Sequence, residues 1–511
     1  MLIDRNSKSE FVLNCFRELL DDGEPHRYRE IIDYVREQAK GTQYEGTIEQ
    51  NNLVLPISKK LEDPAFPYAR VSHGIYQKTE QSPVQQESVG CHTPSAYDLL
   101  DILFVVQRQM EVIHKTQQEE FPSSKTLEQS FQVVSGHLET LLDSMSMWIA
   151  DMDFACPPEI VAAVQKRTSH PVYGYRFAPE ETRKAVCHWQ KKRFDLDIAP
   201  ESILFGSGVL PIVDSAIEAM TKPGDGVIIQ PPVYYPFANG IRQCQRTVIE
   251  NPLIEREVDG RLQYSLDLDG LRTLAARDDV TAMILCNPHN PAGRIWAPEE
   301  QRLVAQICRD NGVFLIVDEI HADLAIGAHR MVPFMKACPD CAGFALSVTS
   351  TSKSFNVAGL GAAYGLAPDE AVRGKVSEWL KRTHAGGLGY LGADAIIAAY
   401  ERCGYYVDGL RKKLEENAAL VYDFCRQRLP QVRVADLQGT YLMWLDLTRL
   451  GIPKEKIERF LLDEAGLIFD PGHWFSERYE GYGRMNIATS TATVRAAMEK
   501  LESAVKNHRE G

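Results

Sequence analysis

The stretch Ser347-Val-Thr-Ser-Thr-Ser-Lys-Ser-Phe-Asn-Val-Ala-Gly359 holds one lysine, Lys353, among small hydroxyl residues. It follows an apolar run and precedes a turn, which predicts that Lys353 lies at the end of a strand. Lysine side chains are normally exposed to water, so a lysine surrounded by small polar groups indicates a functional role. Its amine can form a Schiff base with a carbonyl group, while Ser350 and Ser352 donate hydrogen bonds to a nearby anion. Because loops rich in serine and lysine are common, this stretch alone still favours a purely structural loop.

A second stretch, Val313-Phe-Leu-Ile-Val-Asp-Glu-Ile-His321, favours a functional site over a structural loop. Its five apolar residues predict a buried parallel strand that ends in the carboxylate of Asp318. Ligands of open α/β sheets bind at the carboxyl ends of such strands. A carboxylate there can pair with a pyridinium nitrogen and keep it protonated, which makes the ring an electron sink.

Two further stretches are predicted to reach the same edge of the sheet. Met283-Ile-Leu-Cys-Asn-Pro-His-Asn-Pro-Ala-Gly293 is an apolar strand whose closing turn directs Asn290 to that edge. Leu204-Phe-Gly-Ser-Gly-Val-Leu-Pro211 is a glycine-rich turn that leads into a helical pattern over Ile212–Met220. The backbone N–H groups of such a turn and the amino end of the helix can hold a phosphate.

In this order, the stretches resemble the fold-type I pyridoxal-phosphate (PLP) enzymes of the class I/II aminotransferase superfamily. The resemblance covers roughly Met147 to Lys506 and is strongest to the cystathionine β-lyase-like carbon–sulfur lyases of the MalY/PatB group. The group-specific stretches are Trp148-Ile-Ala-Asp-Met-Asp-Phe154, Val172-Tyr-Gly-Tyr175, Pro232-Val-Tyr-Tyr-Pro-Phe237, Asp318-Glu-Ile-His321 and Thr349-Ser-Thr-Ser-Lys-Ser-Phe-Asn356.

The resemblance implies an α/β fold: a PLP-dependent transferase large domain with a mainly parallel sheet, followed by a small C-terminal α+β lobe. It also implies a homodimer that binds pyridoxal 5′-phosphate. Lys353 would form the Schiff base and later remove the α-proton of an amino-acid substrate. The other implied site residues are Asp318 at the ring nitrogen, Asn290 and His321 near the phenolic oxygen, Tyr234 on the ring face, Gly208, Val209, Ser350, Ser352 and the neighbouring subunit's Tyr175 at the phosphate, and Arg484 at the substrate's carboxylate.

Two departures from the wider pattern bear on the reaction. Many aminotransferases carry an arginine eight residues after the Schiff-base lysine, where this chain has Gly361. MalY-like lyases also lack that arginine, so Gly361 favours the lyase interpretation. The loop Gly389-Tyr-Leu-Gly392 stands where related lyases often carry an Asn/Ser-Pro segment, which leaves the substrate open.

Composition bounds the remaining classes of function. The net charge is −14 over 511 residues, which argues against general binding to nucleic acid or anionic membranes. The N-terminus is polar and no apolar run is long enough to span a bilayer, so neither a signal peptide nor a membrane helix is expected. The 11 scattered cysteines fit a reducing cytoplasm. The single C-x-x-C, Cys338-Pro-Asp-Cys341, has no second pair, so a plain loop and no metal site are predicted.

The chain before the resemblance is divided into two parts. Residues 1–80 show three short helical patterns and a predicted hairpin, Phe66–Lys78, which together resemble a winged helix. Residues 81–145 form a polar linker and a helical connector, and residues 146–508 form the catalytic domain. Residues 1–90 hold 11 Lys and Arg against 15 Asp and Glu, whereas DNA-binding modules are usually basic. We therefore expect the N-terminal domain to contact proteins or carry substrate rather than bind DNA.

The expected activity is α,β-elimination from a cysteine S-conjugate or cystathionine-like substrate, which yields a thiol, pyruvate and ammonia. Transamination is the first alternative, since it begins with the same steps, and a decarboxylating or oxidative variant also stays open. The third alternative is a PLP-sensing winged-helix transcriptional regulator, against which the acidic N-terminal domain counts.

Overall fold

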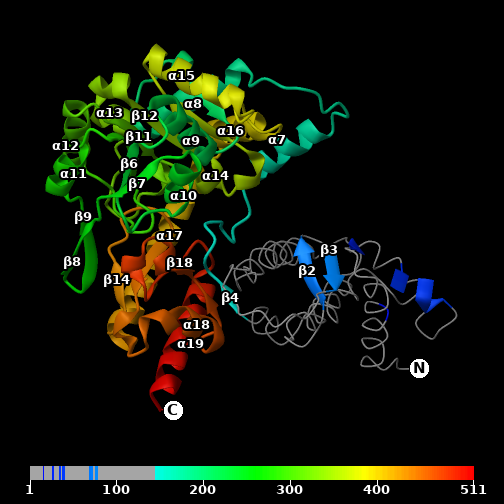
Figure 1. The fold of residues 1–511 in the computed structure, drawn as a ribbon, viewed down its shortest axis with the longest axis vertical. Coiled ribbons are helices and arrows are strands. Elements are labelled where there is room, and N and C mark those ends of the chain that lie inside the picture. The colour runs from blue at the N-terminus through cyan, green and yellow to red at the C-terminus, as the bar shows by residue number, and fades with distance from the viewer. Residues whose placement is uncertain are drawn as a thin grey trace. The chain divides into compact units, whose positions relative to one another are not determined.

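The structure is a computed structural model that describes residues 144–510 and a few positions before them: residues 15, 34–35 and 37–40, and the strands His26–Arg27, Tyr68–Ser72 and Ile75–Lys78. The chain divides into two compact units, Met1–Asp143 and Ser144–Gly511 (Figure 1). The predicted division at residues 80 and 145 stays a prediction.

The N-terminal unit contains a small antiparallel sheet. Strand β2 (Tyr68–Ser72) pairs antiparallel with the next strand in the sequence, β3 (Ile75–Lys78), which confirms the predicted hairpin. Strand β1 (His26–Arg27) adds to the other side of β3. The three predicted helices, the polar linker and the connector helix lie outside the described residues, apart from a few helical positions such as Cys15. The winged-helix interpretation is therefore untested.

A seven-stranded sheet forms the centre of the second unit, in the order β5-β13-β12-β11-β10-β6-β7. Strands β12, β11, β10, β6 and β7 run parallel, and β13 is antiparallel to both β12 and β5, so the sheet is mainly parallel as predicted. The bounds are β5 Ile203–Gly206, β6 Gly226–Ile229, β7 Thr247–Glu250, β10 Val280–Cys286, β11 Phe314–Asp318, β12 Ala345–Ser350 and β13 Ala363–Leu366.

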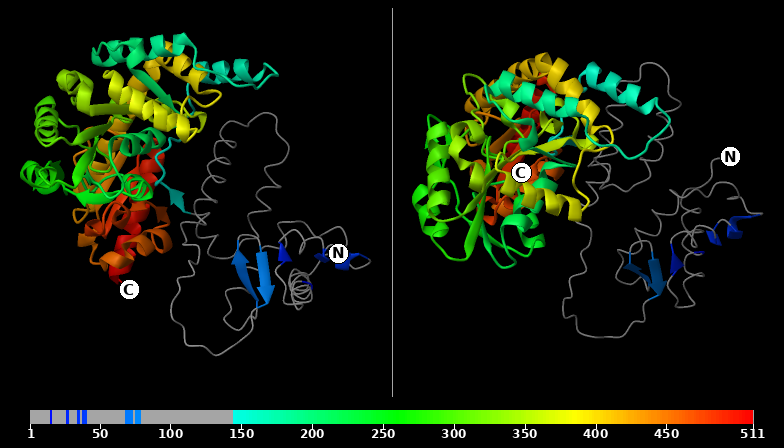
Figure 2. Two further views of the ribbon diagram at one scale, coloured as in Figure 1. Left: turned by 45° about the horizontal axis from the view of Figure 1, so that its top comes forward. Right: turned by 90° about the horizontal axis from the view of Figure 1, so that it is seen from above.

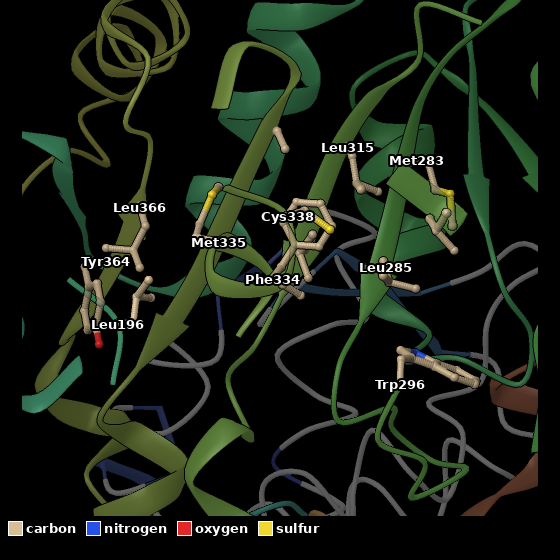
Figure 3. Close-up of a cluster of buried hydrophobic side chains, with 14 of the residues drawn as sticks. Leu196, Met283, Leu285, Trp296, Leu315, Phe334, Met335, Cys338, Tyr364 and Leu366 are labelled. Carbon is tan, nitrogen blue, oxygen red and sulfur yellow. The ribbon is translucent and has the colours of Figure 1, made fainter. Parts of the chain in front are cut away.

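Helices cover both faces of this sheet, which explains why its central strands are continuously apolar. Met283 and Leu285 of β10 face one hydrophobic cluster, while Ile284 and Cys286 face another. Figure 3 shows part of the first cluster, which includes Phe334 and Leu315. Helices α8 (Glu180–Phe194), α11 (Leu268–Ala275), α12 (Pro298–Asp310), α13 (Phe334–Ala337) and α16 (Gly392–Arg402) contribute to the first cluster, and α9 (Val209–Met220), α10 (Pro236–Gln243) and α15 (Glu370–Arg382) to the second.

The smaller lobe contains a six-stranded sheet in the order β17-β18-β15-β14-β9-β8. Its strands are β8 Ile254–Val258, β9 Arg261–Ser265, β14 Arg433–Ala435, β15 Leu442–Asp446, β17 Asp470–Pro471 and β18 Tyr482–Asn486, and its helices are α17 Gly404–Arg428, α18 Ile457–Asp463 and α19 Thr491–Glu510. The lobe was predicted to be C-terminal only, but β8 and β9 come from the middle of the chain and β9 pairs in parallel with β14.

Several predicted bounds need correction. The sequence predicts a long helical region from Tyr400 to Arg428, and the structure has two helices there, α16 and α17, which are separated at Cys403. The sequence also predicts a strand over Gly343-Phe-Ala-Leu-Ser-Val348, but β12 begins at Ala345, because Gly343 and Phe344 end the 3₁₀ helix η3 (Pro339–Phe344). Cys341 lies within that helix rather than in a plain loop.

The remaining elements are short or connect the main ones. A pair of two-residue strands, β4 (Met145–Ser146) and β16 (Leu467–Ile468), joins the start of the unit to the smaller lobe. The others are α7 Pro158–Thr168, α14 Ser352–Phe355, η1 Pro200–Ser202, η2 Ala322–Leu324, η4 Ala358–Leu360, η5 Thr448–Leu450, η6 Lys454–Lys456, η7 Gly472–Trp474 and η8 Glu477–Tyr479. Between α7 and α8, the chain extends away from the body of the unit (Figure 2). Within the described part of the chain, no helix is both long and apolar enough to cross a membrane.

Candidate active site

A cavity of about 230 Å³ opens at the carboxyl ends of β10 and β11, beside the amino end of α9. Seven of the predicted site residues line it: Gly208, Val209, Tyr234, Asn290, Asp318, His321 and Lys353. Ala150, Leu210, Pro211, Cys286 and Ile320 complete the lining. The fold therefore brings together residues that are up to 203 positions apart in the chain.

Asp318 is the last residue of β11, and its side chain is buried at the floor of the cavity. Burial raises the pKa of Asp318 to about 7, although a hydrogen bond from the Ile320 backbone N–H at 3.0 Å and the charge of Lys353 both oppose that rise. A cation placed beside Asp318 favours the ionised carboxylate, because an opposite charge at short range lowers a carboxyl pKa.

Lys353 lies in the short helix α14, directly after β12. Its Nζ donates a hydrogen bond to the carbonyl oxygen of Ala150 at 2.6 Å, and the Tyr441 hydroxyl donates to the same oxygen at 2.7 Å. One backbone carbonyl from the start of the catalytic unit thus holds the lysine amine at the cavity.

Backbone carbonyl groups hold the segment Trp148–Phe154 at the site by accepting hydrogen bonds. The Asn356 side chain, at the end of α14, donates to the carbonyl oxygens of Met152 and Phe154 at 2.9 and 2.8 Å. The Asn486 side chain donates to Ile149 and Asp151 on the opposite side. From the sequence, this segment is recognisable only as a group-specific motif. Backbone carbonyls contribute no residue-type signal, so no pattern predicted the contact between Ala150 and Lys353.

His321, Tyr234 and Asn290 surround the remaining walls. Burial, followed by the charges of Lys353 and Arg484, lowers the pKa of His321 to about 3, so its imidazole is neutral. The His321 Nδ1 has no hydrogen-bond partner among the described residues. Burial also raises the pKa of the Tyr234 hydroxyl.

The amino end of α9 forms the opposite wall of the cavity. Gly208 is its N-cap residue, and the first backbone N–H groups of any α-helix have no partner within the helix. A Cβ at Gly208 would lie 3.3 Å from the Pro211 ring, so a larger residue would crowd this turn. This wall therefore offers N–H donors to an anion.

The two predicted phosphate-binding serines are placed differently from the glycine turn. Neither Ser350 nor Ser352 is among the residues that line the cavity. The Ser350 hydroxyl donates to the Ala362 carbonyl oxygen at 2.8 Å and accepts the Ser352 N–H at 3.0 Å. In the structure, the Ser350 hydroxyl therefore stabilises the turn before Lys353.

Gly361 occupies the position where many aminotransferases carry an arginine. Its φ is +62°, which L-residues other than glycine seldom adopt. A Cβ there would lie 3.2 Å from the Ser207 carbonyl oxygen and 3.3 Å from the Gly389 backbone. The tight approach of the Gly389 loop thus leaves no room for an arginine at position 361.

Tyr175 lies in the extended segment between α7 and α8 and is fully exposed, so it does not line this chain's cavity. Val172, Tyr173 and Phe177 in the same segment are also exposed. The base of the segment is fixed by an ion pair between Arg176 and Asp394.

Arg484, on β18, is buried next to the cavity but is not among its lining residues. Its Nη1 donates to Asn290 Oδ1 at 3.1 Å, which connects it to the site. It also forms a buried ion pair with Asp470, a residue for which the sequence predicts no role. The alternation of side chains along a single strand does not predict this ion pair, because the pair depends on the register between β17 and β18.

Comparison with known proteins identifies the family. The family model described as aminotransferase class I and II matches residues 143–501. Cystathionine beta-lyase PatB of Bacillus subtilis is 36% identical over 371 residues, which span 73% of this chain and 95% of PatB. Protein MalY of Escherichia coli is 31% identical over 366 residues, 71% of this chain and 92% of MalY.

A solved structure agrees with these relatives. Cystalysin from Treponema denticola, which contains a pyridoxal 5′-phosphate cofactor, superimposes with a TM-score of 0.69 and 31% identity, covering 75% of this chain and 97% of cystalysin. The chain therefore belongs to the class I and II aminotransferase family, within its pyridoxal-phosphate-dependent cystathionine β-lyase group of carbon–sulfur lyases.

Proposed function

We propose that the protein cleaves the Cβ–S bond of a cysteine S-conjugate or cystathionine-like amino acid by α,β-elimination. One observation carries this proposal: a single cavity joins the amine of Lys353, the carboxyl group of Asp318 and the amide of Asn290. The names of two relatives, cystathionine beta-lyase PatB and the pyridoxal-phosphate-bound C–S lyase from Staphylococcus hominis, support the same reaction class.

The residues present fit pyridoxal 5′-phosphate. The N–H groups at the amino end of α9 suit its phosphate, and Asp318 suits its ring nitrogen. The buried His321 Nδ1, which has no partner among the described residues, lies on a wall that the ring would face. When bound, the cofactor supplies an electron sink for the charge that develops at the substrate's α-carbon.

The protein's own groups then account for the remaining steps. Lys353 Nζ removes the proton from the substrate's Cα, and the Cβ–S electron pair leaves with the sulfur as a thiolate. The released aminoacrylate hydrolyses to pyruvate and ammonia. Arg484 and Asn290 would orient the substrate's carboxyl group, and Tyr234 would pack against the bound cofactor, so that the substrate is held in a geometry that favours loss of the sulfur.

Product analysis distinguishes elimination from transamination, which shares the first proton transfer. With L-cystathionine or another S-substituted cysteine, we expect pyruvate, ammonia and a free thiol without any added keto acid. L-Alanine, which has no leaving group at Cβ, should give none of them. Turnover that requires a keto acid and yields a new amino acid would replace the lyase proposal with an aminotransferase.

Arg484→Lys tests the orientation of the substrate in the same assay. A lysine is a point charge that cannot reproduce the planar fork of a guanidinium, so most of the pyruvate release should be lost. Full activity in this variant would show that Arg484 does not orient the substrate.

We also propose a homodimer in which Tyr175 of each chain reaches the phosphate site of the other. The exposed aromatic side chains of the segment that carries Tyr175 support this proposal, because such side chains are usually covered. In mixtures of Tyr175→Phe and Lys353→Ala chains, a hybrid dimer would hold one intact site and one doubly altered site. Activity should return on mixing, and its absence despite demonstrated subunit exchange would contradict shared sites.

The remaining predicted features extend this proposal. We expect residues 1–80, 81–145 and 146–508 to be the functional divisions of the chain, with the first used for protein contacts or substrate delivery. The ten cysteines among the described residues are all free thiols, which supports a cytoplasmic location.

A further inference from the structure

The ion pair between Arg484 and Asp470 places a negative charge beside the arginine proposed to hold the substrate. The two residues face each other across β17 and β18, and both side chains are almost completely buried, at 3% and 1% exposure. A buried pair of opposite charges is neutral overall, so Arg484 offers the site much less positive potential than an unpaired arginine would.

The guanidinium is also occupied by other acceptors. Nη1 donates to Asn290 Oδ1, and Nη2 donates to the Trp148 carbonyl oxygen at 3.0 Å as well as to Asp470. The Phe475 ring lies beneath the guanidinium, 5.1 Å from its carbon. An incoming carboxylate must therefore share these donors with Asp470, and it meets the repulsion of that carboxylate.

A carboxylate and a carboxamide respond differently to such a pair. A carboxylate accepts hydrogen bonds only, so a site with donors and a positive charge suits it best. A carboxamide carries no charge and offers both an acceptor and a donor, so a neutral pair of arginine and aspartate does not penalise it. Neutralising the arginine consequently reduces the advantage that a free carboxylate otherwise has.

We infer that Asp470 is a positioning residue that sets substrate selectivity through Arg484, so that amino acids with an amidated carboxyl group bind nearly as well as free amino acids. The inference rests on the proposed function, because it needs Arg484 to meet the substrate's carboxyl group. It extends the substrate class to S-substituted cysteines whose carboxyl group forms an amide.

The test measures binding rather than turnover. L-Alanine and L-alaninamide are titrated into the holoenzyme, and each dissociation constant is read from the absorbance of the bound cofactor. The quantity compared between variants is the ratio of the two constants, because the different basicities of the two amines then cancel.

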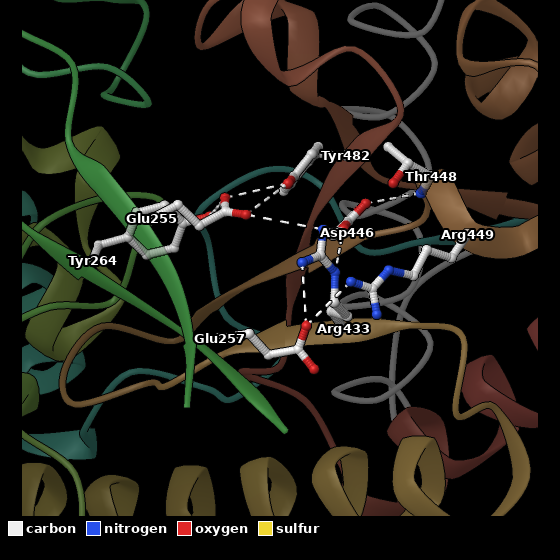
Figure 4. A network of polar contacts seen from close by, with 8 residues as sticks. All are labelled: Glu255, Glu257, Tyr264, Arg433, Asp446, Thr448, Arg449 and Tyr482. Atoms are coloured by element: carbon white, nitrogen blue, oxygen red, sulfur yellow. Dashed lines mark hydrogen bonds and ion pairs between the residues drawn. The ribbon is translucent and has the colours of Figure 1, made fainter. Parts of the chain in front are cut away.

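The structure offers a matched control for Asp470→Asn. Asp446 is also fully buried and forms an ion pair with an arginine on the neighbouring strand of the same sheet, Arg433. Figure 4 shows that pair in a network with Glu255 and Tyr482, none of which lines the cavity. Asp446→Asn thus breaks an equivalent pair without touching Arg484.

Asp470→Asn should raise the preference for alanine over alaninamide by about tenfold, which is the usual effect of a charge-assisted hydrogen bond on binding. Asp446→Asn should leave the preference as in the wild type. A rise of less than about threefold with Asp470→Asn, or an equal rise with Asp446→Asn, overturns the inference, since tenfold is the expected scale.

Two measurements keep the result decisive. If Asp470→Asn does not fold, Asp470→Ser is tested in its place. The ratio of the two dissociation constants in the wild type is a second measurement. A wild-type preference for alanine over alaninamide above about a hundredfold overturns the inference, because it equals the full effect of a charged hydrogen bond on binding. Pyruvate release from cystathionine by the wild type is scored separately. Its absence would refute the proposed lyase reaction without changing the binding ratio.

Discussion

The carboxyl group of Glu319, at the carboxyl end of β11, provides a quantitative test of burial at this edge of the sheet. Glu319 follows Asp318 directly, but it does not line the cavity. Its Oε1 accepts the backbone N–H of Phe334 at 2.7 Å, and the side chain is buried. Burial raises the pKa of Glu319 from 4.5 to about 8, although the hydrogen bond from the Phe334 N–H partly offsets the rise. The carboxyl group is therefore mostly protonated at neutral pH.

The direction of the pH effect follows from this raised pKa. A carboxyl group with a higher pKa in the folded state contributes its full stability below pH 4.5 and loses it as the pH rises towards 8. Each pKa unit corresponds to about 1.4 kcal/mol, so Glu319 should cost the wild type about 3–4 kcal/mol between pH 5 and pH 8. Glu319→Gln keeps the acceptor for Phe334 but cannot ionise, so it should avoid this loss.

Urea unfolding of both proteins at several pH values measures the difference. The free energy of unfolding of Glu319→Gln, relative to the wild type, should increase by about 1 kcal/mol per pH unit over this range. Glu299→Gln, at the exposed start of α12, is the matched control and should follow the wild type at every pH. A difference between Glu319→Gln and the wild type that stays constant from pH 5 to pH 8 would refute the buried, protonated carboxyl group.

Three other predictions concern neighbouring positions. Borohydride should fix the cofactor covalently to the wild-type chain but not to Lys353→Ala, as mass spectrometry of the denatured chain will show; a fixed cofactor in the variant would exclude Lys353 as the attachment site. Gly361→Ala should lower the free energy of unfolding by about 1–2 kcal/mol, because its φ of +62° is unfavourable for alanine; unchanged urea unfolding would show that the turn relaxes. Asp323→Ala should cost about 2–4 kcal/mol, because the buried donors of Ser354 and Trp189 lose their acceptor, whereas Asp323→Asn should retain part of it; equal losses in both variants would contradict this.

Much of the large domain was predictable because its signals are local. Continuous apolar runs predicted β10 and β11 as buried parallel strands, since helices cover both faces of the sheet. Asp318 ends β11 and Lys353 lies just after β12, so their approach to the same edge followed from the parallel pairing of these two strands. The glycine turn before α9 predicted the helix amino end in the same way.

The smaller lobe was less predictable. Strands β8 and β9 are separated from β14 by more than 160 residues, and their pairing with it leaves no periodic signal near either segment. The break at Cys403 was also missed, because the apolar pattern continues through it from α16 to α17.

The sequence by itself therefore determined the strand and helix types, the family resemblance and the residue types gathered at the sheet edge, because periodicity and turn chemistry act over a few neighbouring residues. Only the tertiary structure decided which atoms these residues contact. The Ala150 carbonyl at Lys353, the Ser350 hydroxyl on Ala362 and the carboxylate of Asp470 beside Arg484 all depend on the register and burial of distant segments. Burial also decided the pKa values of Asp318 and His321, because the cost of removing a charge from water depends on everything packed around it.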